Sequence, residues 1–130
     1  MPRHCFSPEQ ANRTLPLVRR IVADLLQRGR ELRQLASTST DEVRQARIAQ
    51  LQADLAQLGT ELERIGCSYK DWGFELGLVD FPGRIGGRDV LLCWRSDEPR
   101  VEWYHEPDAG FAGRRPIPRE LLPPAGSEER

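Results

Sequence analysis

Residues 7–36 read SPEQANRTLPLVRRIVADLLQRGRELRQLA, and this stretch decides the fold because its apolar residues recur every three or four positions. That spacing places them along one side of an α-helix. Ser7 is a good N-cap, Pro8 suits the first helical position, and Gln10 completes a capping box with Ser7. The pattern therefore predicts a helix over residues 8–36. Its apolar stripe comprises Ala11, Leu15, Leu17, Val18, Ile21, Val22, Leu25, Leu26, Leu32, Leu35 and Ala36.

A second helix is predicted over residues 39–65, after a polar break at residues 37–40. Ser39 and Glu42 have the spacing of another capping box, and Gly66 stands where a left-handed C-terminal cap is expected. The apolar positions again alternate by three and four: Ile48, Leu51, Leu55, Leu58, Leu62 and Ile65. A short loop between two long helices indicates an antiparallel hairpin.

The rest of the chain has the signals of strands and turns. The run 77–82 reads as a strand that ends at Pro82, and Gly86-Gly87 is a hairpin signal. Residues 90–94 form an apolar strand, and residues 100–105 alternate between apolar and polar. Together these runs predict a small antiparallel β-meander packed on the helical hairpin.

The expected fold is therefore α+β: a long antiparallel helical hairpin followed by a small antiparallel β-meander. A chain of 130 residues suffices for one core. We expect a single domain over residues 1–117, in which residues 67–117 hold the sheet and a loop rich in Gly and Arg. The Pro-rich and charged stretch 118–130 is predicted to be a flexible tail.

The length of the helices favours self-association. A helix of about 27 residues is roughly 40 Å long, whereas a strand of about six residues spans only some 20 Å. The sheet would then leave part of the hairpin uncovered. We therefore expect a homodimer in which the helices of two copies form a four-helix, coiled-coil-like bundle.

Composition excludes several classes of protein. The formal net charge is −1 and the basic residues are mixed with acidic ones along the helices, so the sequence predicts no nucleic-acid binding. Apolar runs fall well short of the roughly 20 residues of a membrane span, so no membrane is expected as a partner. The three cysteines are odd in number and widely spaced, which favours a reducing, cytoplasmic location.

Several motifs lie along about residues 6–117: Phe6 to Asn12, Leu15 to Val18, Gly77 to Pro82, Cys93-Trp94, Glu98-Pro99, Tyr104-His105 and Gly110 to Ile117. Together, and in this order, they resemble an uncharacterised prokaryotic family, domain of unknown function 2203. The resemblance implies a shared fold and a shared site, and it implies no activity.

Imidazole and carboxylate side chains gather in the second half. His105, Glu106 and Asp108, with Asp80 from an earlier strand, suit a divalent transition metal such as Zn, Fe, Mn or Ni. Glu106 follows His105 directly, so on a strand the two side chains point to opposite faces. The competing interpretation is a buried His105 hydrogen-bonded to a carboxylate. Asp80 and His105 also suit an acid–base pair, whereas Cys93 in an apolar run is interpreted as a small hydrophobe.

The loop 110–115 is the second candidate. Gly110 and Gly113 let the backbone turn, and the guanidinium groups of Arg114 and Arg115 suit a small phosphate or carboxylate ligand. The alternative is that the two arginines pair with Asp80, Glu106 or Asp108 and pin the loop to the sheet.

Two functions are compatible with these residues. The first is a cytosolic, homo-oligomeric assembly or binding module that carries a polar corner of Asp, His, Glu and Arg side chains. The alternative is a small metal-dependent or acid–base enzyme that uses that corner.

Overall fold

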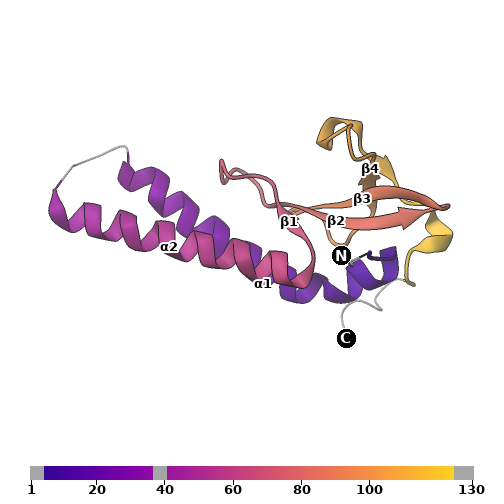
Figure 1. Ribbon diagram of the computed structural model, residues 1–130, viewed down its shortest axis with the longest axis horizontal. Coiled ribbons are helices and arrows are strands. Elements are labelled where there is room, and N and C mark those ends of the chain that lie inside the picture. The colour runs from indigo at the N-terminus through magenta and orange to yellow at the C-terminus, as the bar shows by residue number, and fades with distance from the viewer. Residues whose placement is uncertain (1–4, 37–40, 125–130) are drawn as a thin grey trace.

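The computed structural model describes residues 5–36 and 41–124, and it confirms the α+β fold. Helices α1 (Pro8–Ala36) and α2 (Glu42–Ile65) form a hairpin. Strands β1 (Ser68–Tyr69), β2 (Leu78–Ile85), β3 (Arg88–Arg95), β4 (Trp103–His105) and β5 (Arg115–Pro116) follow. They form one antiparallel sheet in chain order, which lies over the N-terminal half of α1 (Figure 1).

The helix ends show which capping predictions hold. The backbone N–H of Ser7 donates to Gln10 Oε1 and that of Gln10 donates to Ser7 Oγ, both at 3.0 Å, which confirms the first capping box. Gly66 has φ +114° and caps α2 as expected. The predicted start of α2 at residue 39 is corrected, because Asp41 is the N-cap and accepts from the Arg44 backbone N–H. Ser39 lies outside the described residues.

Strand β2 does not end at Pro82, as the sequence suggested, but continues to Ile85. The Pro82 carbonyl accepts from the backbone N–H of Phe6, at 2.7 Å. In a strand the N and O of one residue point to the same side. The donor that proline lacks therefore faces Phe6 and not β3, and the pairing of β2 with β3 loses no hydrogen bond.

The two faces of the sheet have opposite characters. The face toward α1 carries large buried side chains: Val79, Phe81, Val90, Leu92 and Trp94. Residues between them in β2 and β3 point to the other face, because successive side chains alternate across a strand. Asn12 joins α1 to the chain just before β4, since its side chain both accepts from and donates to the Val101 backbone.

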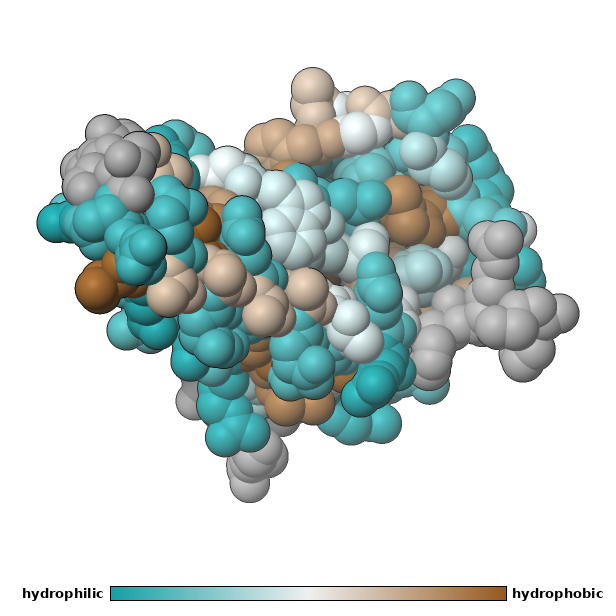
Figure 2. All heavy atoms as spheres, turned by 60° about the vertical axis from the view of Figure 1, so that its left-hand side comes forward, coloured by the Kyte–Doolittle hydropathy of each residue, from teal (hydrophilic) through white to brown (hydrophobic). Residues whose placement is uncertain are grey.

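The hairpin extends beyond the sheet at its loop end (Figure 1), as the lengths of the helices and strands predict. There the two helices cover each other, because Leu25, Leu51 and Leu55 are buried. Cross-helix ion pairs, such as Arg47 with Glu31 at 2.9 Å, join the helices beside that contact. In Figure 2, which brings this end forward, hydrophilic residues dominate the surface.

Among the described residues, the large hydrophobic side chains exposed on the helices are Leu17 and Val43. Self-association through the helices thus stays a prediction, with less open apolar surface than the sequence suggested. Within the same residues, neither helix is apolar enough over a sufficient length to cross a bilayer.

The stretch expected as a tail begins with defined structure. A 3-10 turn, η2, spans Arg119–Leu121, and Leu122 packs against the core. Arg100 donates to the Pro123 carbonyl at 3.0 Å. Residues 118–124 are therefore attached to the core and to the segment before β4, and residues 125–130 lie outside the described part of the chain.

The connection between β1 and β2 packs on α1 through a close contact at Gly29. Phe74 lies in the left-handed region, at φ +61°, which is unusual for a bulky residue. The Asp71 carboxylate holds the surrounding turn by accepting three backbone N–H groups, those of Gly73, Glu75 and Leu76. A Cβ at Gly29 would lie 2.2 Å from the Phe74 ring, so only glycine fits there.

We expect Gly29→Ala to lower the free energy of unfolding by about 1–3 kcal/mol, because the added methyl group overpacks the Phe74 site. Gly59→Ala in α2 is the matched control. Its Cβ would meet the half-exposed Trp72 ring at 3.3 Å, and that ring has room to shift. Alanine is the better helix former, so this variant should be neutral or gain up to about 1 kcal/mol. Urea unfolding of both variants measures the difference, and equal effects would contradict the Phe74 contact.

Candidate functional site

Three side chains from three strands meet on the face of the sheet that points away from the helices. Asp80 of β2 lies directly opposite Cys93 of β3, and His105 of β4 lies opposite Leu91. Residues 91 and 93 share a face because the side-chain period of a strand is two. The pairing therefore places Asp80, Cys93 and His105 side by side, and we call them the Asp–Cys–His cluster.

The cluster is compact and almost wholly buried. His105 Nε2 lies 3.3 Å from each carboxylate oxygen of Asp80. One ligand atom from each of the three residues, with Cys93 supplying Sγ, lies within 4.8 Å of the other two. The exposed fractions are 4% for Asp80, 0% for Cys93 and 3% for His105. Three polar groups are thus removed from water together, which is costly unless they satisfy one another or a ligand.

The other ring nitrogen of His105, Nδ1, is held by the backbone. Nδ1 lies 2.8 Å from the backbone carbonyl oxygen of Glu106. A carbonyl oxygen only accepts, so Nδ1 carries a hydrogen and donates it. In the neutral ring, Nε2 then presents a lone pair to the Asp80 carboxylate, which also carries lone pairs. A proton or a cation must lie between them, because two acceptors facing each other in a buried site repel.

Cys93 is not a nucleophile in this setting. Burial raises the pKa of its thiol to about 12, and the negative charge of Asp80 adds to the effect. The thiol is therefore protonated at neutral pH, whereas attack requires the thiolate. A bound metal ion changes this, because a coordinating thiol loses its proton outright.

The other predicted metal ligands lie apart from this cluster. The Glu106 carboxylate pairs with Arg88 at 3.0 Å, and its contribution to the cluster is the backbone carbonyl that holds His105. Asp108 is exposed on the loop beyond β4. Asp80 and His105 come together as predicted, and the structure brings in Cys93 where the sequence suggested Glu106 and Asp108.

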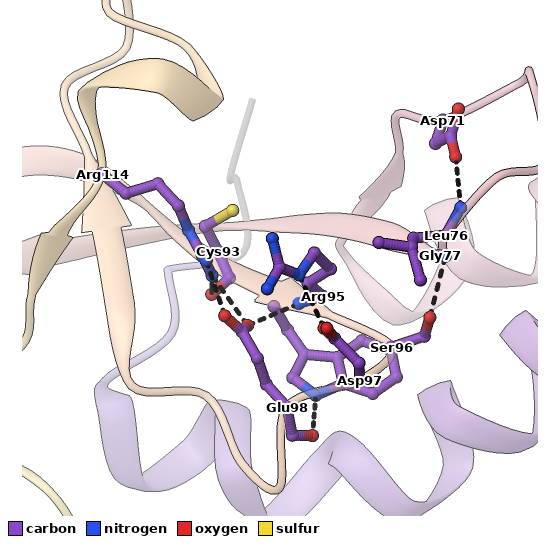
Figure 3. A network of polar contacts seen from close by, with 10 residues as sticks. Asp71, Leu76, Gly77, Cys93, Arg95, Ser96, Asp97, Glu98 and Arg114 are labelled. Atoms are coloured by element: carbon purple, nitrogen blue, oxygen red, sulfur yellow. Dashed lines mark hydrogen bonds and ion pairs between the residues drawn. The ribbon is translucent and has the colours of Figure 1, made fainter.

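Arg114 sits beside the cluster and is already engaged (Figure 3). Its guanidinium donates to both carboxylate oxygens of Glu98, at 2.6 and 2.7 Å, and to the Cys93 backbone carbonyl at 3.2 Å. It also lies over the rings of Trp103 and Phe111. Arg114 thus pins its loop to the sheet, but through Glu98 and not through Asp80, Glu106 or Asp108.

The remaining residues of the predicted anion loop show no converging arrangement. Arg115 is exposed on the edge strand β5. Gly110 has φ +71° and precedes the 3-10 turn η1 (Phe111–Gly113), so its role is to turn the chain. Gly113 lies at the end of that turn, where its N–H donates to the Gly110 carbonyl.

Sequence reasoning missed two residues of the site, Cys93 and Glu98. A signal in the sequence could have revealed Cys93. A two-residue turn at Gly86-Gly87 pairs residue 85 with residue 88. In an antiparallel hairpin the two residue numbers of every further pair add up to the same total. That rule alone places Asp80 opposite Cys93. Glu98 had no such signal, because it stands in the turn before β4 and its partner Arg114 is 16 residues away.

The family comparison agrees with the motifs. A model of the uncharacterized conserved proteins DUF2203 matches residues 4–117. The chain belongs to the DUF2203 family. Its match includes all members of the Asp–Cys–His cluster and also Glu98 and Arg114. Neither a curated protein nor a solved structure matches the chain.

From the buried thiols we predict that the free energy of unfolding depends on pH. Burial raises the pKa of Cys67 to about 12, whereas a thiol in an unfolded chain titrates near 8.5. Between these values the unfolded chain has lost a proton that the folded chain keeps. The free energy of unfolding therefore falls as pH rises above about 9, by about 1.4 kcal/mol per pH unit for each such group.

We expect Cys67→Ala to make this decline shallower in metal-free protein, by up to about 1.4 kcal/mol per pH unit. Urea unfolding between about pH 9 and 11 measures the slope. Cys5→Ala is the matched control, because Cys5 is exposed. Identical slopes for the Cys67 variant and the unchanged protein would contradict the burial of this thiol.

Proposed function

We propose that this protein binds a divalent transition metal ion of the zinc class through Asp80, Cys93 and His105. The observation that carries the proposal is the orientation of His105. Its Nδ1 is committed to the Glu106 carbonyl, so Nε2 is the nitrogen that faces the Asp80 carboxylate. A hydrogen bond from one ring nitrogen to a carbonyl is also the usual way in which proteins orient a metal-binding histidine.

The distances fit such an ion after small adjustments. A tetrahedral ion with bonds of about 2.0–2.3 Å separates its ligand atoms by roughly 3.3–3.7 Å. The Nε2 and carboxylate atoms are already 3.3 Å apart. All three ligand atoms lie within 4.8 Å of one another, so moving Cys93 Sγ inward by about 1 Å completes one face of the tetrahedron.

The donor types select the class of metal. Imidazole, thiolate and carboxylate together favour zinc or a similar transition ion, while calcium and magnesium prefer all-oxygen sites. Three protein ligands leave a fourth position for water or an added ligand. An acid–base role for Asp80 and His105 has less support, because both are nearly inaccessible and a general base must reach its substrate.

The test measures how much metal the protein holds per chain, and whether substitutions in the cluster lower that amount. Protein purified without chelator, and protein reloaded with Zn²⁺ or Co²⁺ after metal removal, should hold about one ion per chain. The Co²⁺ form should show a thiolate-to-cobalt charge-transfer band. Cys93→Ser should abolish this band, because the serine oxygen cannot replace the thiolate.

Asp80→Asn and His105→Gln should weaken binding through loss of one ligand each. Cys67→Ser is the matched control, because Cys67 is equally buried but lies outside the cluster. Zn²⁺ at 100 times its dissociation constant should raise the free energy of unfolding by about 2.7 kcal/mol in the control. A metal content that is negligible, or the same in all variants, would show that the cluster holds only a proton.

A further inference from the structure

Metal access to the cluster requires a segment of the protein to move. The three side chains are between 0% and 4% exposed, so neither an ion nor a reagent reaches them in the closed structure. On one side of the sheet, the core between β3 and α1 blocks the way. The opening must therefore come from the segments that lie on the other face.

Residues 106–114, which we call the cover loop, lie on that face. The loop leaves β4 directly after His105 and returns to the sheet at β5. Figure 1 shows it rising from the side of the sheet opposite the helices. At its start the Glu106 carbonyl accepts from His105, and at its end Arg114 donates to the Cys93 carbonyl. Both ends of the loop thus contact the cluster.

The cover loop has the hydrogen bonding of a detachable segment. Its turns close within the loop, through Ala109 N–H to the Glu106 carbonyl and Gly113 N–H to the Gly110 carbonyl. Opening the loop would therefore keep these bonds. Its far end is tied to the rest of the protein by the side chain of Arg114. The Phe111 ring adds a contact with Arg95 of β3, whose Cζ lies 5.6 Å from the ring centroid.

The Arg114–Glu98 pair is the strongest of these attachments. It is bidentate, and each of its side chains is only 11% exposed. The other ion pair of the loop, Arg88 with Glu106, has a side chain of Arg88 that is 69% exposed, and exposed pairs contribute little. Glu98 is itself held, because its carboxylate also accepts from the Arg95 backbone N–H.

We propose that the cover loop is a gate over the Asp–Cys–His cluster, and that the Arg114–Glu98 pair is the latch that holds the gate shut. The role of the gate in metal entry rests on the proposed function. The opening of the loop does not depend on a metal. The thiol of Cys93 reports opening directly in metal-free protein. The buried thiol of Cys67, at the end of α2, reports unfolding of the whole domain in the same molecule.

The experiment follows alkylation of both thiols in metal-free Cys5→Ser protein by peptide mass spectrometry. Glu98→Gln removes the charge of the latch, while the remaining amide oxygen can still accept from Arg95. We expect Cys93 to react about 10- to 100-fold faster in this variant, as loss of a charge-assisted hydrogen bond implies. The rate at Cys67 should change by less than about threefold.

Arg84→Gln is the matched control, because it removes an exposed ion pair with Asp89 from the same sheet and should leave both rates unchanged. The gate is overturned if neither thiol of Glu98→Gln reacts faster, or if both accelerate together, since Cys93 is then exposed only by unfolding. A protein that opens in this way but takes up no metal contradicts the proposed function alone. A protein that binds metal, but whose Cys93 and Cys67 alkylation rates change equally in Glu98→Gln, contradicts the gate alone.

Discussion

The two-residue turn at Gly86-Gly87 is the constraint on which the sheet and the cluster both depend. It fixes the register of β2 against β3, and a shift by one residue would move every side chain to the opposite face. With the observed register, Phe81 and Leu92 face α1 while Asp80 and Cys93 face away from it. The same pairing therefore builds the apolar core on one side of the sheet and gathers polar groups on the other.

The helices give this arrangement a fixed base. Trp94 is fully buried on the helix side, and its indole N–H donates to the Glu98 carbonyl in the turn that follows β3. That turn carries the carboxylate which holds Arg114. The core, the turn and the cover loop are thus linked through Glu98, although each lies on a different element.

The sequence predicted most of the fold because local rules decide it. The box of Ser7 and Gln10, the cap at Gly66 and the apolar periods of both helices act within a few residues and are visible without tertiary structure. The two errors, at Pro82 and at the start of α2, come from local rules that another contact overrides. At Pro82 that contact is tertiary, and at α2 it is a competing N-cap. Proline is accepted in β2 because its missing donor faces Phe6, and Asp41 caps α2 by taking the Arg44 N–H.

The site was harder to predict because its members depend on pairing across strands. Asp80 and His105 were recognised by residue type alone. A cysteine in an apolar run looks like a hydrophobe until its cross-strand neighbour is known, so the sequence alone indicates a small hydrophobe at Cys93. The partner of Arg114 depends on how the turn before β4 folds back, and nothing in the spacing of charged residues specifies Glu98 over the other acidic groups.

The energetics of the cluster support the proposal that it binds a ligand. Well-packed apolar side chains at buried charged positions are often as stable as the charged groups they replace, or more stable. The positions next to Asp80 and Cys93 along β2 and β3 hold large hydrophobic residues, which face the helices on the other side of the sheet. Stability alone would then favour apolar residues at positions 80 and 105. In the proposed site, the positive charge of a bound cation would attract both the Asp80 carboxylate and the Nε2 lone pair of a neutral His105.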